Sequence, residues 1–231
     1  MEIAPVEIDV LYEDDFLIFV NKPPRLVVQR GYDPDEPILL DLVRERAQQP
    51  VHLLQRLDRG TSGVIFFSKS SAMNVRITRQ FEKKRVRKRY LALCEGELAE
   101  TQTIDAPLAR VGAIKFAVRD DGKRAVTHIA PIIATPRGSL LDVTLETGRT
   151  HQIRVHLSAI GHPLAGDWLY GDRNADRPML HAAELEMMHP ATNKPLCVAA
   201  PLPADFLDEM RRREIVLSEG HNVLAWTHVT H

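Results

Sequence analysis

Residues 53–67 read LLQRLDRGTSGVIFF, an acidic residue between two arginines, then a run of small and polar residues, then an apolar segment. The apolar segment at 64–67 predicts a buried strand. We expect residues 60–63 to form the turn that leads into it. An opposite charge within about 4–6 Å keeps a carboxylate ionised even when it is partly desolvated. Asp58 is therefore expected to be an ionised carboxylate beside a rigid strand.

Further strands are predicted on both sides of this segment. The alternation over residues 89–95 places Leu91 and Tyr90 on opposite faces of one strand. In the strand expected at 140–146, Leu141 and Val143 should point into the core. The remaining predicted strands span residues 8–11, 16–21, 125–134, 179–188 and 195–199.

Helices are predicted between these strands from residues that are typical of helix starts. Pro37 fits the first turn of a helix that ends near Gln48-Pro50, and Ser70 or Ser71 can cap a helix that reaches about Lys84. Thr150 can cap a third helix that stops at Gly161. A fourth is predicted at 203–213, with Phe206 and Met210 on its buried side. The pattern predicts one α+β domain over residues 1–231 with a mixed, largely antiparallel sheet, and it leaves residues 215–231, with Leu224 and Trp226, unassigned.

Composition narrows the class of protein. The chain has 231 residues, a mass of 26.1 kDa and 44% hydrophobic residues, which suffices for a packed core without disulfides. Cys94 and Cys197 are far apart in sequence, and we expect buried free thiols. No export signal is evident and no apolar run approaches about 18 residues. We therefore expect a cytoplasmic protein with no membrane partner.

Charge is unevenly distributed along the chain. The net charge is −1, but residues 76–90 hold eight Lys and Arg against one Glu, a local +7 that leaves −8 for the rest. On the helix expected there, Arg76, Arg79 and Lys83 share one face. A concentrated basic patch attracts polyphosphate. The alternative is a solvated charged face with no partner.

Several sequence blocks carry a family resemblance. They are VNKPPRLVV at 20–28, RLDRGTSG at 56–63, KRYLALCEG at 88–96 and GRTHQIRVHLSAIGHPLAGDWLYG at 148–171. Together, over about residues 8–205, they closely resemble RluA-type pseudouridine synthases. The resemblance implies a central catalytic cleft and an isomerase that flips a uridine of structured ribosomal or transfer RNA and converts it to pseudouridine. It implies RNA as the partner, with no DNA and no obligate protein partner. Because the blocks begin by about residue 8, we expect no N-terminal S4-like RNA-binding module.

The resemblance also assigns roles to residues. Asp58 corresponds to the catalytic carboxylate, Arg154 to its basic partner, and Tyr90 to a phenol that stacks on uracil and can take the C5 proton. Arg56 corresponds to the residue that fills the gap left by the extruded base. The remaining expected RNA contacts are Arg59, Arg76, Arg79, Lys83, Arg149 and His151. The structural alternatives are a salt bridge at a turn for Asp58, a core position for Tyr90 and a surface position for Arg154.

The chemistry needs no cofactor, and no metal site is expected. His151 and His156 are five residues apart, about 140° around a helix, so they cannot chelate one ion as an i, i+4 pair does. Two departures from the family are Gln55, where His is usual, and Pro24-Arg25, where a Gly is usual.

Two rival functions remain. One is an RNA-binding protein without turnover, which only Gln55 favours. The other is a hydrolytic glycosidase or base-removing enzyme, which normally needs two carboxylates. We expect Asp58 to be the only acidic residue at the site, which disfavours the glycosidase.

Overall fold

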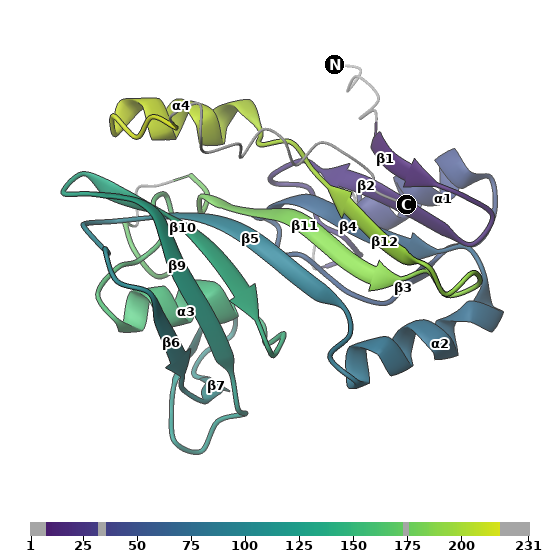
Figure 1. Ribbon diagram of the computed structural model, residues 1–231, viewed down its shortest axis with the longest axis horizontal. Coiled ribbons are helices and arrows are strands. Elements are labelled where there is room, and N and C mark those ends of the chain that lie inside the picture. The colour runs from purple at the N-terminus through teal and green to yellow at the C-terminus, as the bar shows by residue number, and fades with distance from the viewer. Residues whose placement is uncertain (1–7, 32–35, 173–175, 218–231) are drawn as a thin grey trace.

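The structure is a computed structural model that describes residues 8–31, 36–172 and 176–217 (Figure 1). Within these residues most strands form one ten-stranded sheet in the order β1-β2-β4-β11-β5-β10-β9-β6, with β12 beside β11 and β3 beside β4. The strands are β1 (Asp9–Glu13), β2 (Leu17–Lys22), β3 (His52–Leu53), β4 (Ser62–Ser68), β5 (Arg87–Cys94), β6 (Gln102–Asp105), β7 (Leu108–Arg110), β8 (Phe116–Val118), β9 (Val126–Thr135), β10 (Gly138–Leu145), β11 (Leu180–Met188) and β12 (Pro195–Ala199). Strands β7 and β8 pair separately as a hairpin.

The sheet is antiparallel except where β4 and β11 run parallel, so the predicted mixed, largely antiparallel α+β fold is confirmed. Gly63 pairs with Ala182 at this parallel contact and has φ +108°. A side chain at Gly63 would overlap the Ala182 backbone, so only glycine fits. Residues 62 and 63 therefore belong to the strand, and the turn lies earlier than predicted. The Thr61 amide closes it on the Asp58 carbonyl at 3.1 Å.

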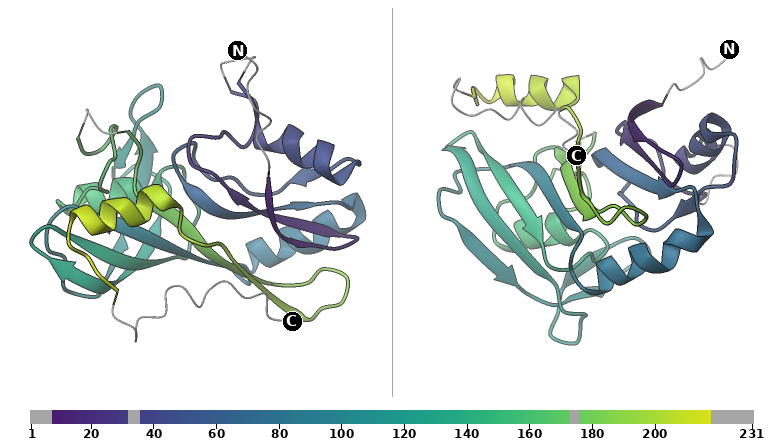
Figure 2. Two further views of the ribbon diagram at one scale, coloured as in Figure 1. Left: turned by 90° about the horizontal axis from the view of Figure 1, so that it is seen from above. Right: turned by 45° about the vertical axis from the view of Figure 1, so that its right-hand side comes forward.

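Helices cover both faces of the sheet. They are α1 (Leu39–Ala47), α2 (Ser71–Glu82), α3 (Gln152–Ala159) and α4 (Ala204–Arg212). Figure 1 shows α2 and α3 on one side of the sheet and α1 and α4 on the other. The two halves, one with α1 and α2 and one with α3 and α4, are joined by the long central strands (Figure 2).

Side chains along β2 and β4 alternate between the two faces of the sheet, which explains how α1 and α2 pack on opposite faces. Phe19 and Phe66 stack at 5.2 Å in the cluster that receives Ile77 of α2. The neighbouring residues Ile18 and Val20 face the other way, into the cluster with α1. Burying one such side chain contributes about 2 kcal/mol, so a one-residue slip of register would be strongly unfavourable.

Strand β5 sets the position of the site. As predicted, Tyr90 and Leu91 face opposite ways: Tyr90 packs in the cluster of Ile153 from α3, whereas Leu91 packs with Phe206 and Met210 from α4. Leu141, Val143 and Leu145 of β10 also join the cluster of Tyr90. Tyr90 is therefore on the same face of the sheet as α3, which carries Arg154.

Two helix starts differ from the predictions. Helix α1 begins at Leu39 after the cap residue Ile38, so Pro37 precedes the helix. Helix α3 begins at Gln152 with His151 as its cap, which corrects the prediction of Thr150. The strands β3, β6, β7 and β8 were missed because segments of two to four residues are too short for a clear alternation. Leu224 and Trp226 lie outside the described residues.

Both cysteines are free, with Cys94 buried and Cys197 only half-buried, which corrects the expectation for the second. Burial raises the pKa of each thiol to about 11, so both stay protonated at neutral pH. In the part of the chain that the structure describes, no helix has the length and apolarity needed to span a bilayer.

Candidate active site

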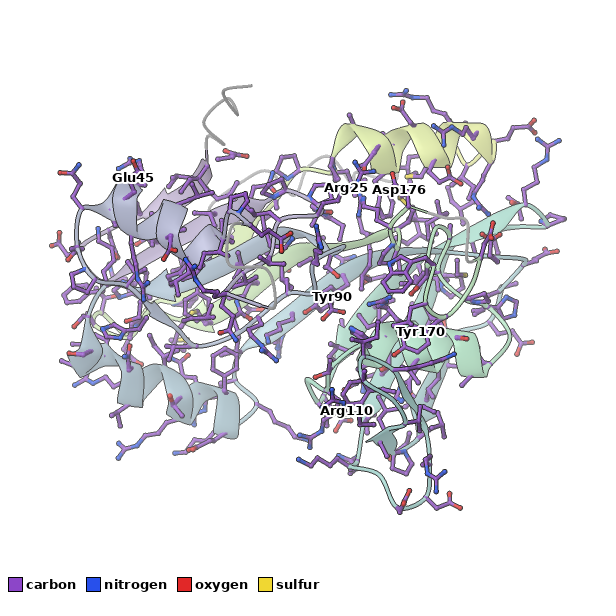
Figure 3. All side chains as sticks on the ribbon, turned by 180° about the vertical axis from the view of Figure 1, so that it is seen from behind. Arg25, Glu45, Tyr90, Arg110, Tyr170 and Asp176 are labelled. Atoms are coloured by element: carbon purple, nitrogen blue, oxygen red, sulfur yellow. The ribbon has the colours of Figure 1, made fainter. Side chains whose placement is uncertain are left out.

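A cleft of about 1530 Å³ lies where the Asp58 turn, β5 and the loop into α3 converge. Figure 3 shows Tyr90 near the middle of the molecule, with Tyr170 to one side of it. Eight basic side chains line the cleft against five acidic ones, so its surface is net positive. The basic ones are Arg56, Arg59, Lys84, Arg87, Lys88, Arg89, Arg149 and Arg154. The structure thus brings together Asp58, Tyr90, Arg154, Arg56, Arg59, Arg149 and His151 of the predicted site.

Asp58 faces two side chains of the α3 segment. Its Oδ2 atom lies 3.6 Å from Arg154 Nη1 and 3.8 Å from His151 Nε2, and its side chain is 28% exposed. The neighbour Arg59 forms its ion pair with Glu36 instead, at 2.7 Å. The bracketing arginines of the sequence are therefore not what neutralises Asp58. The cation comes from a helix that follows almost one hundred residues later.

Arg154 is shared between two carboxylates. Its Nε and Nη2 atoms donate to the two Asp167 oxygens at 2.7 and 2.8 Å, while Nη1 is left to face Asp58. The guanidinium also lies over the ring of Tyr170, 5.1 Å from its centre. Burial opposes the charge on Arg154, but the hydrogen bonds and charge of Asp167, together with the electrostatic influence of Asp58 and Tyr170, outweigh it and raise the pKa. Arg154 is thus held in one orientation as a permanent cation.

Asp167 corrects the expectation of a single acidic residue at the site. It lies inside the block at 148–171 and is fully buried. Besides Arg154, its Oδ1 atom accepts hydrogen bonds from the amides of Leu169 and Tyr170, at 3.0 and 3.2 Å. A carboxylate so fully engaged orients Arg154 and is not available as the second acid of a glycosidase. Asp167 could have been predicted from the dipeptide Gly166-Asp167, which follows an apolar helix that carries an arginine.

Tyr90 forms part of the wall of the cleft. Its side chain is 7% exposed and packs in the cluster with Ile153. Burial, and after it the Asp58 carboxylate, raises the pKa of Tyr90, so the phenol stays protonated at neutral pH. A protonated, apolar-packed ring suits stacking on a base.

Two buried basic side chains hold the Asp58 turn, and neither was predicted from the sequence. Lys22 Nζ donates to the Arg59 carbonyl at 3.1 Å and to the carbonyls of Pro23 and Leu26. Arg177, 1% exposed, donates to the Gly60 carbonyl at 3.0 Å.

These two basic side chains differ in what compensates their charge. Arg177 is neutralised by a bidentate pair with Asp205 of α4, at 2.6 and 2.8 Å. Burial, reinforced by the nearby Arg177, lowers the pKa of Lys22 to about 7. The turn is thus fixed by β2 on one side and by the entry to β11 on the other. The only sequence signal for Lys22 was its position in the block at 20–28.

Gln55, the departure from the family pattern, also lines the cleft. Its Nε2 atom is buried and has no hydrogen-bond partner among the described residues. It does not contribute a charge next to Asp58, as a protonated histidine would.

Three predicted RNA contacts lie outside the cleft. Arg76, Arg79 and Lys83 line a separate depression of about 290 Å³ between α2 and the β11–β12 hairpin, which we call the α2 depression. Arg76 donates to the Pro190 carbonyl at 3.0 Å, and Gln80 ties α2 to Met188. The three cations share one face, as the spacing predicted, but that face is directed away from Asp58.

Across the described residues, no three His, Cys, Asp or Glu side chains come together in a way that suits a metal ion. His156 bonds to Thr127 and to the Ala106 carbonyl, and His181 bonds to Ser62 and to the Ala200 carbonyl. These histidines are engaged within the fold. Independence from metal stays a prediction for experiment.

Comparison with known proteins agrees with this geometry. Residues 16–159 match the family described as RNA pseudouridylate synthase. The chain is 37% identical over 218 residues to ribosomal large subunit pseudouridine synthase D of Nitrosomonas europaea, covering 87% of this chain and 63% of that protein. It is 35% identical over 230 residues to tRNA pseudouridine synthase C of Salmonella typhimurium, covering 88% of each. Human RNA pseudouridylate synthase domain containing 1 superposes with a TM-score of 0.74 at 28% identity, covering 88% of this chain and 87% of that one.

The chain belongs to the RNA pseudouridylate synthase family, and the resemblance to its RluA-type members is confirmed. It spans less than two thirds of the Nitrosomonas relative, at 63% of that length.

Proposed function

We propose that this chain isomerises a uridine of structured ribosomal or transfer RNA to pseudouridine, with Asp58 as the reacting carboxylate. The C1′–N1 bond breaks, the uracil turns in place and a C1′–C5 bond forms, while C5 loses a proton and N1 gains one. The reaction is redox-neutral and has no need of a cofactor. Because its substrates are cellular RNAs, the proposed compartment is the cytoplasm.

The observation that carries this proposal is the position of Asp58 in a net positive cleft, beside an immobilised cation. Arg154 is oriented by Asp167 and presents its remaining nitrogen to Asp58 at 3.6 Å. A carboxylate with a nearby buried cation remains ionised after RNA displaces water from the cleft. Ionised and poorly hydrated, Asp58 is suited to attack C1′ or to remove the 2′ proton.

Tyr90 is proposed to stack on the uracil. Burial keeps the phenol of Tyr90 protonated. Tyr90 is therefore not a phenolate and does not accept the C5 proton. Its packing in the cluster that includes Ile153 holds the ring in the wall of the cleft, where the base is proposed to rest. This favours stacking over the alternative role as a base.

Base extrusion is assigned to Arg56, which lies exposed on the cleft wall two residues before Asp58. Removing a base from its stack costs a few kcal/mol, and a planar guanidinium in the gap offsets part of this cost. Arg59 and Arg149 flank the same opening and are proposed to contact phosphates.

RNA beyond the target nucleotide is proposed to contact two surfaces. One is the basic rim of the cleft, where Lys84 and Arg87 are exposed. The other is the α2 depression with Arg76, Arg79 and Lys83. Both present cations to solvent, which is the requirement for phosphate contacts that release counterions.

Tritium release from RNA containing 5-tritiated uridine tests the activity. The expected result is stoichiometric release from one uridine in ribosomal or transfer RNA prepared from cells that lack the gene, and none from RNA of cells that carry it. Mapping pseudouridines in the two RNA pools identifies the target. Binding of RNA with no release from either pool would establish the rival, an RNA-binding protein without turnover.

A further inference from the structure

His151 lies at the first position before α3 in a left-handed backbone conformation, with φ 57° and ψ 19°. Its side chain is 15% exposed, so it is poorly placed to serve mainly as a phosphate contact. Its ring makes two directed approaches, one to the Tyr170 hydroxyl and one to Asp58. A residue other than glycine keeps such a backbone only where its surroundings determine it. The side chain, not the backbone, is therefore what this position is built to present.

The proton positions around this ring follow from the donors available. The Phe116 amide can only donate, and it donates to the Tyr170 hydroxyl oxygen at 3.0 Å. In the arrangement that also uses the hydroxyl proton, Tyr170 donates to His151 Nδ1, 2.9 Å away. With Nδ1 as acceptor, the single proton of a neutral imidazole is on Nε2.

Electrostatics at the other side of the ring selects the same tautomer. His151 Nε2 is 3.8 Å from Asp58 Oδ2, and a lone pair there would face a carboxylate. A proton on Nε2 instead presents a donor to it. The charged and titratable groups that face the ring are Asp58, Arg154, Asp167 and Tyr170. Burial lowers the pKa of His151, against the opposing influence of Asp58 and with Arg154 acting in the same direction as burial, so the ring is neutral at pH 7.

The approaches of His151 and Arg154 converge on a single carboxylate oxygen. Both His151 Nε2 and Arg154 Nη1 face Oδ2 of Asp58, at 3.8 and 3.6 Å. For both side chains Oδ2 is the nearer carboxylate oxygen, which leaves Oδ1 as the oxygen farther from both. Separations of this length in the free protein are expected to shorten when substrate excludes water.

Given the proposed function, we propose that His151 is a positioning residue for Asp58: a relay from the Phe116 amide through Tyr170 holds its Nε2–H toward Oδ2, so that Oδ1 is the oxygen that reacts with the sugar. Tyr170 and the β7–β8 hairpin thereby act on the carboxylate without touching the substrate. This assigns to His151 a role different from the RNA contact that the family resemblance implied.

The relay itself is tested without any activity. Two-bond nitrogen–proton NMR spectra of ¹⁵N-histidine protein at pH 7 report the tautomer of each ring, and His151→Gln identifies the His151 signals by their loss. The expected result is the Nε2–H tautomer in the parent and a mixture of tautomers in Tyr170→Phe. A protonated Nδ1 in the parent, or an unchanged spectrum in Tyr170→Phe, would overturn the relay.

The consequence for catalysis is tested by single-turnover tritium release at saturating enzyme, alongside RNA affinity from filter binding. Tyr170→Phe should slow the step by about 10-fold and His151→Ala by about 100-fold, in the range of outer-shell hydrogen bonds that orient a reacting group, with RNA affinity unchanged. His151→Gln, which keeps an N–H donor, should recover most of the rate lost in His151→Ala. A weakened RNA affinity with an unaltered rate would show that His151 is a phosphate contact instead.

Tyr12→Phe provides the matched control, because its hydroxyl bonds to Asp14 on the far β1–β2 edge and should affect neither the rate nor the His151 signals. Thermal unfolding of each variant identifies loss of fold. If the parent protein itself releases no tritium, the proposed function fails, while the tautomer measurement still decides the relay.

Discussion

The cleft and the α2 depression are both lined by arginine and lysine, but they hold these charges in different ways. In the cleft, Arg154 is 5% exposed and gives two of its nitrogens to Asp167. In the α2 depression, Arg76, Arg79 and Lys83 are exposed to solvent. Arg154 is held by two hydrogen bonds to one carboxylate, whereas Arg76 of the α2 depression is held by a single hydrogen bond to the Pro190 carbonyl.

This difference separates chemistry from binding. A buried cation needs a neutralising carboxylate, because desolvation would otherwise cost several kcal/mol, and the resulting pair has one geometry. An exposed cation costs nothing to keep and gains affinity only by releasing counterions from RNA. We therefore expect changes to the buried pair of Arg154 and Asp167 in the cleft to alter rate, and changes to exposed cations, such as those of the α2 depression, to alter affinity and its dependence on salt.

The largest effect is expected at Asp58. Asp58→Ala and Asp58→Asn should reduce tritium release to below about one per cent of the parent, since an essential reacting group is removed. RNA affinity should remain close to that of the parent, because phosphate contacts dominate binding. Turnover by Asp58→Ala above that level would show that Asp58 is not the reacting group of the cleft.

Arg154 is expected to have the next largest effect. Arg154→Lys keeps the charge but cannot bind Asp167 with two parallel hydrogen bonds, so turnover should fall by about 100-fold. Arg154→Met leaves Asp167 buried without its partner and should also destabilise the fold by about 3–5 kcal/mol. In Arg154→Met the rate should fall across the whole rate–pH profile, because Asp58 loses the cation that faces it at 3.6 Å.

The control for this experiment is Arg213→Lys. Arg213 makes a comparable bidentate pair with Glu95, away from the cleft. It should change stability without changing the rate–pH profile. A profile for Arg154→Met that overlays the parent at similar rate would show that Arg154 and Asp58 do not act together.

The α2 depression should show a smaller effect of a different kind. Replacing Arg76, Arg79 and Lys83 with Gln should lower affinity and flatten the plot of log affinity against log salt by about two units, at roughly 0.7–0.9 per phosphate contact. Turnover of bound RNA should barely change.

A matched triple variant separates contact from net charge. Arg137, Arg211 and Arg212 are exposed and lie on α4 or face its end, so replacing them with Gln removes the same charge at another surface. Its salt slope should equal that of the parent. If the α2 variant also keeps the parent slope, this helix presents a solvated face and RNA is held by the cleft alone.

No effect is expected from chelators. Full turnover in excess EDTA is predicted, because Asp58 is held by Arg154 and His151 and the described residues assemble no metal-ligating group. The measurement is tritium release before and after prolonged incubation with the chelator. Loss of activity that zinc restores would show that turnover requires a metal ion bound in the cleft or in the α2 depression.

Local patterns predicted most of the secondary structure. Alternation along β5 correctly placed Tyr90 opposite Leu91, and helical spacing correctly placed Phe206 and Met210 on the buried side of α4. Such patterns are readable because each strand or helix repeats its buried face at a fixed period. They failed at the starts of α1 and α3, where the cap depends on backbone conformation as well as on residue type.

The order of the sequence blocks also predicted a site at Asp58, Tyr90 and Arg154, because blocks of this spacing identify the family, and the structure brings the three residues to one cleft. The block order did not identify the partners of these residues. Arg59, adjacent in sequence to Asp58, pairs with Glu36, and Arg154 pairs chiefly with Asp167. Adjacent residues on a turn point in different directions, so sequence proximity is a poor guide to ion pairing.

The sequence alone therefore determined the fold class and the family, since these depend on local periods and on motif order, and it predicted Asp58 as the reacting carboxylate. Only the tertiary structure decided how the charges are distributed. It directed the α2 stripe away from Asp58, placed Lys22 and Arg177 beneath the turn and brought His151 to Oδ2. The physical reason is that a buried charge needs a partner of opposite charge, and this partner can lie far away in the sequence, as Asp205 does for Arg177. That partner is set by strand order, and above all by the parallel contact of β4 with β11, which no local pattern encodes.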